Sequence, residues 1–160
     1  MKTVEIMDDF LSVHDFEHIR NNTLYSNEFP LYYVNGVALY SGFVHGFYIN
    51  GRKSQWCDLL FPLFAKLEIN QLLRAKLNFY PKTQFLRKNH NWHIDNPSNH
   101  KGCILFLNTC NGETHIKNKP FDFKIKSIEN RALFFDPSIK HRSTTCTNAE
   151  YRSNIIINYN

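Results

Sequence analysis

The sequence predicts an α+β fold in which two helices come first and a jelly-roll core of short strands follows. Apolar residues recur at helical spacing before residue 70, whereas short apolar runs separated by Asn, Gly, Pro and Lys begin at residue 75. The chain contains 14 Phe and 8 Tyr, and aromatic residues are typical of β-rich cores. At 160 residues it is expected to form a single domain, in which residues 1–74 support a core built by residues 75–160.

The first helix is expected over residues 8–26. Asp8 or Ser12 can cap its start, because a side-chain oxygen at that position accepts a hydrogen bond from a free backbone N–H. Its apolar face consists of Phe10, Val13, Phe16 and Ile19.

A second helix follows a stretch with Gly breaks, residues 30–50, which is interpreted as two strands joined by a turn. The helix is indicated by an apolar stripe at positions i, i+3, i+4, i+7, i+8 and i+11, namely Trp56, Leu59, Leu60, Leu63, Phe64 and Leu67. Pro62 lies within the stripe, so the helix either kinks there or begins near Asp58. Both helices are expected to buttress one outer face of the sheet and to leave the mouth of the core open.

From residue 75 the chain reads as a succession of short strands. They are expected at 75–80, 102–108, 113–117, 121–126, 131–136, 141–146 and 152–159. If Arg152 faces inward in the last strand, alternation also places Asn154, Ile156 and Asn158 on the inner face, and Ser143 shares the face of His141.

Two histidines and one aspartate form a candidate metal site on this scaffold. In an extended segment His93 and Asp95 point to the same side, about 7 Å apart along the strand. The third ligand, His141, begins a distant strand, and Arg152 begins the next, beside His141 if the two strands pair. Each residue alone is more often an ordinary half-buried histidine or a surface charge, whereas the ordered set indicates a metal. Two imidazoles and a carboxylate suit Fe(II), and an arginine suits a carboxylate-bearing co-substrate.

At these residues the chain resembles the 2-oxoglutarate and Fe(II)-dependent dioxygenases, especially their prolyl-hydroxylase-like branch and the short oxygenases of marine phages. The resemblance covers residues 72–159. The matching pieces are Ala75-Lys-Leu-Asn-Phe-Tyr80-Pro81, His93-Ile-Asp95-Asn96-Pro97, Ile104-Leu-Phe-Leu-Asn108, Asn111-Gly-Glu-Thr114, Glu129-Asn-Arg-Ala-Leu-Phe-Phe-Asp136, His141 and Arg152-Ser-Asn-Ile-Ile-Ile-Asn158.

This resemblance implies a double-stranded β-helix fold and an enzyme that uses Fe(II), 2-oxoglutarate and O₂. It implies that His93, Asp95 and His141 bind iron and that Arg152 pairs with the 5-carboxylate of 2-oxoglutarate. Further candidates for the co-substrate pocket are Tyr80, Asn78, which shares the face of Tyr80, and Thr114.

One position departs from the pattern. Where the hypoxia-sensing prolyl hydroxylases carry a tyrosine that helps to hold the co-substrate, this chain has Phe106. Arg152 therefore needs another hydroxyl partner, with Thr114 or Tyr80 as the candidates, and transfer of the prolyl-peptide substrate is weakened.

Other polar residues near the motifs have ordinary interpretations. His90 and His100 are interpreted as loop histidines near the entrance that could contact substrate. Asn108 and Gly112 are interpreted as turn residues.

The expected primary substrate is a peptide or protein side chain or a small molecule. Oxidative demethylation of a nucleic-acid base and a cupin-like metal protein without 2-oxoglutarate remain alternatives. The net charge of +5 would suit nucleic acid. However, the densest basic group alternates with apolar residues, as on the solvated face of a half-buried strand; it consists of Lys117, Lys119, Lys124 and Lys126. Residues 27–55 should build a substrate lid, and the sequence predicts no oligomeric state.

The location expected from the sequence is the cytoplasm, or the host cytoplasm if a phage encodes the chain. The four cysteines form no C-x-x-C pair, so they are expected to be reduced thiols rather than zinc or redox ligands. The first residues lack the apolar stretch of a signal peptide, and no run reaches the length of a membrane span.

Overall fold

The fold is that of a computed structural model that describes residues 4–35, 41–95, 100–117, 120 and 122–160. The helical elements are α1 (Val13–Thr23), the 3₁₀ helix η2 (Cys57–Leu60) and α2 (Phe61–Lys66). The strands are β1 (Glu5–Met7), β2 (Tyr32–Val34), β3 (Gly42–Ile49), β4 (Arg52–Lys53), β5 (Leu72–Pro81), β6 (Lys101–Phe106), β7 (Glu113–Ile116), β8 (Phe123–Lys126), β9 (Ala132–Phe135), β10 (His141–Ser143) and β11 (Tyr151–Tyr159).

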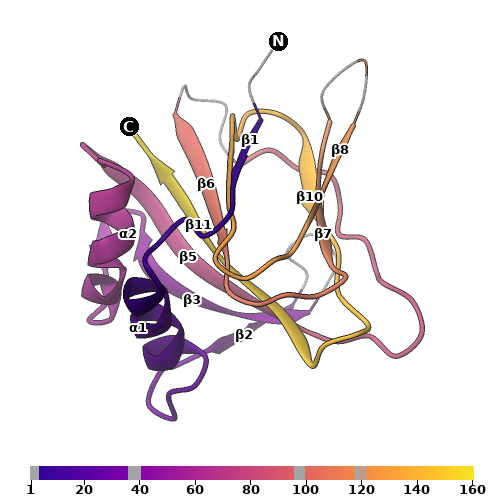
Figure 1. Ribbon diagram of the computed structural model, residues 1–160, viewed down its shortest axis with the longest axis horizontal. Coiled ribbons are helices and arrows are strands. Elements are labelled where there is room, and N and C mark those ends of the chain that lie inside the picture. Colours follow the sequence, from indigo (N-terminus) through magenta and orange to yellow (C-terminus); the bar gives the residue numbers. More distant parts are fainter. Residues whose placement is uncertain (1–3, 36–40, 96–99, 118–119, 121) are drawn as a thin grey trace.

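In the described part of the chain these strands form two antiparallel sheets that face each other (Figure 1). The larger sheet has the order β1-β9-β6-β11-β5-β3-β2, with β4 paired to β3, and the smaller has the order β10-β7-β8. Several neighbouring strands come from distant parts of the chain, as in a jelly roll, for example β1 and β9 or β5 and β11. The expected jelly-roll fold is confirmed.

Alternating residues divide the larger sheet into two faces. On β11, Ile155 and Ile157 are fully buried against the helices, whereas Arg152, Asn154 and Asn158 point between the sheets. The inward face predicted for the last strand is therefore confirmed. On β5, Ala75, Leu77 and Phe79 likewise join the apolar core, and the even positions from Arg74 to Tyr80 point inward.

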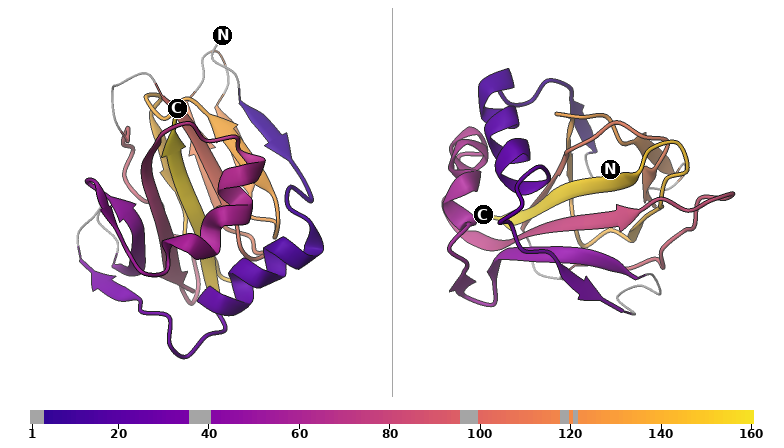
Figure 2. Two further views of the ribbon diagram at one scale, coloured as in Figure 1. Left: turned by 90° about the vertical axis from the view of Figure 1, so that its left-hand side faces the viewer. Right: turned by 90° about the horizontal axis from the view of Figure 1, so that it is seen from below.

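The helices cover the outer face of the larger sheet, as expected (Figure 2). Phe16 and Ile19 of α1 and Leu60 and Leu63 of the second helical region pack in the same core as the outward side chains of β5, β6 and β11. Full burial of each such side chain contributes about 1.5–3 kcal/mol to folding.

Both helices are shorter than predicted. The Ser12 hydroxyl accepts a hydrogen bond from Asp15 N at 3.1 Å and caps α1 at residue 13. Phe10 therefore precedes the helix, and Val13 is 72% exposed rather than part of its apolar face. Pro62 lies in the first turn of α2, where the N–H that proline lacks would have no helical partner in any case. The apolar stripe from Trp56 to Leu67 is therefore carried by two short helices, η2 and α2, instead of one.

The inner space is filled by a second apolar cluster at one end and left open at the other. Ile104 and Phe106 of β6 meet Ile116 of β7 and Ile125 of β8 between the sheets. Polar side chains line the other end, which becomes the mouth.

Residues 27–55 do not form a separate lid where the structure describes them. Instead β2, β3 and β4 extend the edge of the larger sheet, where β3 pairs with β5. Gly36 and its successors to residue 40, part of that predicted lid, lie outside the described residues.

Asn130 connects the start of the chain to the sheets. Its side-chain amide donates to Leu11 O at 2.8 Å and its Oδ1 accepts from Leu11 N at 3.0 Å. Its φ of 57° lies in the left-handed region, which asparagine tolerates better than most residues.

Among the described residues, no helix is long and apolar enough to cross a membrane. The four cysteines are free and buried, and their reduced state stays a prediction.

Candidate metal centre and co-substrate pocket

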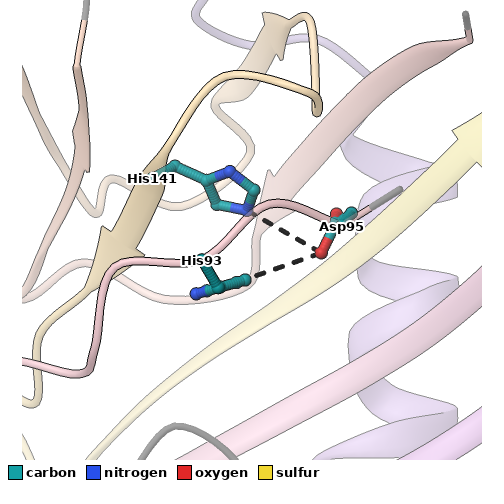
Figure 3. Close-up of side chains that lie close together, drawn as sticks. All are labelled: His93, Asp95 and His141. Carbon is teal, nitrogen blue, oxygen red and sulfur yellow. Dashed lines mark ion pairs between the residues drawn. The ribbon is translucent and has the colours of Figure 1, made fainter. Parts of the chain in front are cut away.

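Three potential metal ligands converge between the two sheets (Figure 3). Nε2 of His93 lies 3.9 Å from Asp95 Oδ1, and Nε2 of His141 lies 3.8 Å from the same oxygen. The ligand atoms of the three side chains all lie within 4.8 Å of one another. One metal ion with bonds of about 2.0–2.2 Å can bridge such a set with small adjustments.

Backbone pairing brings the two histidines together. His93 N donates to His141 O at 3.0 Å and His141 N donates to His93 O at 2.9 Å, which makes an isolated antiparallel bridge. Asp95 N donates to Pro137 O at 3.1 Å. The segment that carries His93 and Asp95 therefore extends the smaller sheet beside β10.

Hydrogen bonds also fix which ring nitrogen faces the centre. Nδ1 of His93 lies 3.1 Å from Asn91 O, and Nδ1 of His141 lies 2.8 Å from Ile139 O. A carbonyl oxygen only accepts, so Nδ1 carries the proton and Nε2 keeps its lone pair for a metal. Burial lowers the pKa of His141, with partial opposition from Asp95, so its neutral, metal-binding form is favoured.

Asp95 is held from two sides of its carboxylate. Its side chain is 7% exposed, with Arg74 Nη1 at 3.4 Å from Oδ1. Asn158 Nδ2 lies 3.4 Å from Oδ2. These neighbours orient the carboxylate towards the histidines.

Arg152 is a buried cation that contacts Thr114, a residue that lines the same cavity as the three potential ligands. It is 0% exposed, and its guanidinium donates to Thr114 Oγ1 at 2.9 Å and to Thr144 O at 3.2 Å. Within the described residues it has no carboxylate partner, and its Nε has no hydrogen-bond acceptor. Burying a guanidinium without an anion is costly, so this position is suited to an anionic ligand.

The surroundings of Arg152 show how the chain manages with a phenylalanine, Phe106, in place of the tyrosine expected from the resemblance. The Phe106 ring lies 5.5 Å from Arg152 Cζ and offers its face to the cation. The hydroxyl partner is Thr114, one of the two candidates expected from the sequence. Gly112 packs so closely that an added Cβ would lie 2.4 Å from Arg152 Cδ. Gly112 is thus a packing position rather than only a turn residue.

Tyr80 belongs to a buried polar chain beside Arg152. It pairs with Arg152 in the register of β5 and β11, and its hydroxyl is hydrogen-bonded to Ser143. Ser143 Oγ lies 2.7 Å from His90 Nδ1. Burial raises the pKa of Tyr80 and lowers the pKa of His90 to about 4, so both groups are neutral at pH 7.

His90 and His100, which were interpreted as loop histidines near the entrance, are both buried and line the cavities of the site. His90 is 4% exposed because its ring packs on Tyr80, with ring centroids 4.6 Å apart. His100 is 8% exposed, and its Nε2 lies 3.2 Å from Asn158 Nδ2.

Asn78, the other co-substrate candidate, lies on the same face of β5 as Tyr80. Its Nδ2 donates to Asn154 Oδ1 at 3.0 Å. Together with the three potential ligands, Tyr80 and Thr114, it lines a cavity of about 320 Å³. The structure thus brings all the predicted site residues to one cavity or, for Arg152, into direct contact with a residue that lines it.

The strands that carry His141 and Arg152 do not pair, so the condition under which the sequence places these two residues side by side is not met. β11 pairs with β5 and β6, whereas β10 pairs with β7 in the opposite sheet. The Arg152 side chain instead crosses the space between the sheets to reach Thr144 and Thr114.

Two cations of the site were missed by sequence reasoning, Arg74 and Lys76. Both line the cavity with Asn78 and Tyr80. Strand alternation could have identified them, because residues 74 and 76 lie an even number of positions before Tyr80 and therefore share its face of β5.

Comparisons with known proteins support this description of the fold. No family model matches the chain, and no curated protein matches it. Among solved structures, a prolyl hydroxylase from Trichoplax adhaerens, in complex with a hypoxia-inducible-factor peptide fragment, is 17% identical with a TM-score of 0.68, over 98% of this chain and 83% of that one.

Two further structures have a higher TM-score of 0.73. An oxidoreductase of the 2OG-Fe(II) oxygenase family from Burkholderia pseudomallei is 12% identical over 98% of this chain and 84% of its own. A non-haem α-ketoglutarate-dependent epimerase of nogalamycin biosynthesis is 10% identical over 99% and 78%. The chain therefore has the double-stranded β-helix fold of the 2-oxoglutarate and Fe(II)-dependent oxygenases.

Proposed function

We propose that this protein is an Fe(II)- and 2-oxoglutarate-dependent dioxygenase, with His93, Asp95 and His141 as iron ligands and Arg152 as the partner of the 5-carboxylate. The observation that carries the proposal is the fully buried Arg152, which has no carboxylate partner in the described chain and which donates to Thr114 in the lining of the cavity of the three potential metal ligands. A cupin-like metal protein would need no such cation.

The donor set fits iron. Two neutral imidazoles and one carboxylate occupy one side of a metal and leave positions for a bidentate co-substrate and O₂. When bound, iron, 2-oxoglutarate and O₂ supply the oxidation, which converts the co-substrate to succinate and CO₂ and hydroxylates a substrate C–H bond.

The protein's own residues position and enclose these reactants. Asn91 O and Ile139 O hold the two imidazoles in their ligand orientation. Thr114 and Thr144 O hold the guanidinium fork, which can bind a carboxylate through two parallel hydrogen bonds.

The proposed outcome is hydroxylation of a peptide side chain or a small molecule, by one domain that extends over residues 1–160. Residues before position 75 would contribute to the site as well as support it, because Val34, Gly42 and Val44 line a cavity that adjoins Asp95. The solved structures named above include one protein bound to a peptide fragment and one epimerase of a biosynthetic pathway, so both substrate types fit the fold.

The test separates the metal from the co-substrate. His93→Ala, Asp95→Ala and His141→Ala should lose iron and the visible absorption of the anaerobic Fe(II)–2-oxoglutarate complex. Arg152→Ala should keep iron, because a guanidinium offers no lone pair, and should lose about 3–5 kcal/mol of 2-oxoglutarate binding, by analogy with broken buried ion pairs.

Arg152→Lys keeps the charge without the fork and should fall between the two. Arg131→Ala is the matched control, because Arg131 pairs with Asp8 away from the cavity. Full iron content in either histidine variant would refute the ligand assignment, and unchanged 2-oxoglutarate affinity in Arg152→Ala would favour the cupin alternative.

A further inference from the structure

One strand supplies polar side chains to two adjoining cavities. The even residues Arg74, Lys76, Asn78 and Tyr80 of β5 line both the 320 Å³ cavity of the metal ligands and a second cavity of about 520 Å³. The second cavity extends towards β3 and also adjoins Asp95. Its size lies within the range of about 300–1,000 Å³ that is usual for small-molecule sites.

Lys76 is an uncompensated cation in this row. It is half-buried, and within the described residues its ammonium group has no hydrogen bond or ion pair, whereas Arg74 is paired with Asp95. Burial lowers the pKa of Lys76 to about 8, so it remains mostly charged at pH 7. The partly desolvated charge is therefore available to an anion from outside the chain.

The reactants of the proposed function do not supply that anion. Iron carries two positive charges, and Asp95 and the two carboxylates of 2-oxoglutarate carry three negative ones, so Arg152 brings their sum to zero and Arg74, which is paired with Asp95, already makes it positive. Arg152 lies beside Tyr80, and Lys76 is four residues from Tyr80 along β5, roughly 13 Å in an extended strand. The charge of Lys76 remains after the co-substrate is accounted for.

Two amide oxygens in the larger cavity also have no partner among the described residues, Asn78 Oδ1 and Asn158 Oδ1. Both side chains are buried, with exposures of 1% and 3%. Their amide orientations are fixed, because Asn78 Nδ2 donates to Asn154 and Asn158 Nδ2 faces the Asp95 carboxylate. Buried acceptors of this kind are suited to N–H or O–H donors of a ligand.

We propose that the primary substrate carries an anionic group, a carboxylate or a phosphate, which binds Lys76, and that its N–H or O–H groups donate to Asn78 and Asn158. This inference rests on the proposed function and narrows its substrate class. A neutral apolar substrate would leave the ammonium group and both amide oxygens without partners.

The test measures binding to the protein loaded with Zn(II) and N-oxalylglycine, an inert analogue that fills the co-substrate site. The carboxylate probe is N-acetylglutamate and its neutral match is N-acetylglutamine. The phosphate probe is glycerol 3-phosphate and its neutral match is glycerol. The readout is the rate at which acetic anhydride modifies Lys76, measured by mass spectrometry, with exposed Lys66 of α2 as the internal reference.

At millimolar concentration, one anionic probe should slow modification of Lys76 by roughly tenfold, whereas its neutral match should not. The probe that protects Lys76 from modification shows whether the anionic group is a carboxylate or a phosphate. For the variants, which lack one of these lysines, isothermal titration measures the affinity for that probe instead. Lys76→Met should weaken binding of that probe by roughly tenfold or more, Lys76→Arg should restore most of it, and Lys66→Met should leave it unchanged.

Equal protection by neutral and anionic probes, or protection by neither anion, would overturn the inference. So would a loss of N-oxalylglycine affinity in Lys76→Met comparable to that in Arg152→Ala, because Lys76 would then hold the co-substrate. A separate measurement on the parent protein, binding of iron and 2-oxoglutarate without any probe, distinguishes these failures from failure of the proposed function.

Discussion

Replacing Gly112 by alanine should weaken co-substrate binding although Gly112 contacts no reactant. The new Cβ would lie 2.4 Å from Arg152 Cδ, 3.0 Å from Arg152 Nε and 3.1 Å from Thr145 O. An ordinary carbon contact needs about 3.4 Å or more, so the Arg152 side chain must shift by about 1 Å. Because Arg152 is fully buried, it cannot relieve the overlap by moving into solvent.

The magnitude follows from the contacts that such a shift would break. The guanidinium lies 2.9 Å from Thr114 Oγ1, and a displacement of about 1 Å takes this pair beyond hydrogen-bonding range. A hydrogen bond to a charged group contributes about 1.5–3 kcal/mol, which corresponds to a decrease of about 10- to 150-fold in 2-oxoglutarate affinity. Overpacking should also lower the free energy of unfolding by about 1–3 kcal/mol.

Isothermal titration of the Zn(II)-loaded protein with 2-oxoglutarate measures the affinity, and urea unfolding measures the stability. Gly51→Ala is the matched control, because Gly51 has a φ of 77° and nothing within 4 Å of an added Cβ. It should lose about 1–2 kcal/mol of stability through backbone strain and keep its affinity. If Gly112→Ala binds 2-oxoglutarate as tightly as the parent, the position of Arg152 does not control co-substrate binding.

Three further predictions concern the protein without ligands. Burial lowers the pKa of His90 to about 4 in the folded state, against 6.5 in the unfolded state, so between these two pH values only the unfolded state binds the proton. The free energy of unfolding should therefore fall by about 3 kcal/mol from pH 6.5 to pH 4. Urea unfolding measures this fall, which should be smaller in His90→Gln. Asn130→Ala loses both hydrogen bonds to Leu11 and keeps a strained φ, so it should lower the free energy of unfolding by about 3 kcal/mol. Asn130→Gly relieves the strained φ and should be about 1 kcal/mol less destabilising. If both variants lose the same stability, the backbone conformation at residue 130 does not contribute. Iodoacetamide should label the four buried thiols only after denaturation, and fast labelling of Cys103, whose pKa burial raises strongly, would contradict the packing described.

Much of the fold was predictable because local patterns decide it. Alternation on the last strand identified the inward side chains Arg152, Asn154 and Asn158, which the structure places between the sheets. The spacing of His93 and Asp95 likewise predicted that both would face one point. In these cases the period of an extended strand is sufficient, and no knowledge of partners is required.

Features that depend on strand partners were not predictable. Whether the strands of His141 and Arg152 pair was left open by the sequence, because sheet order is set by packing between distant segments. His90 was interpreted as a loop histidine near the entrance, and its contacts with Tyr80 and Ser143 from other strands could not be read from the sequence. Lys76 was overlooked because a single lysine in a strand is usually a surface charge, and the sequence does not show that a second sheet faces it.

Because the backbones of His93 and His141 are joined by reciprocal hydrogen bonds, the geometry of the metal site does not depend on the number of residues between these two ligands. In such a hydrogen-bonded antiparallel pair the Cα atoms lie about 5.5 Å apart whatever the intervening chain does. The cost of a longer intervening loop grows only slowly, by roughly 0.6 kcal/mol for each doubling of its length. Relatives of this protein could therefore gain or lose residues between the two histidines, for instance to admit a larger substrate, and retain the same metal geometry.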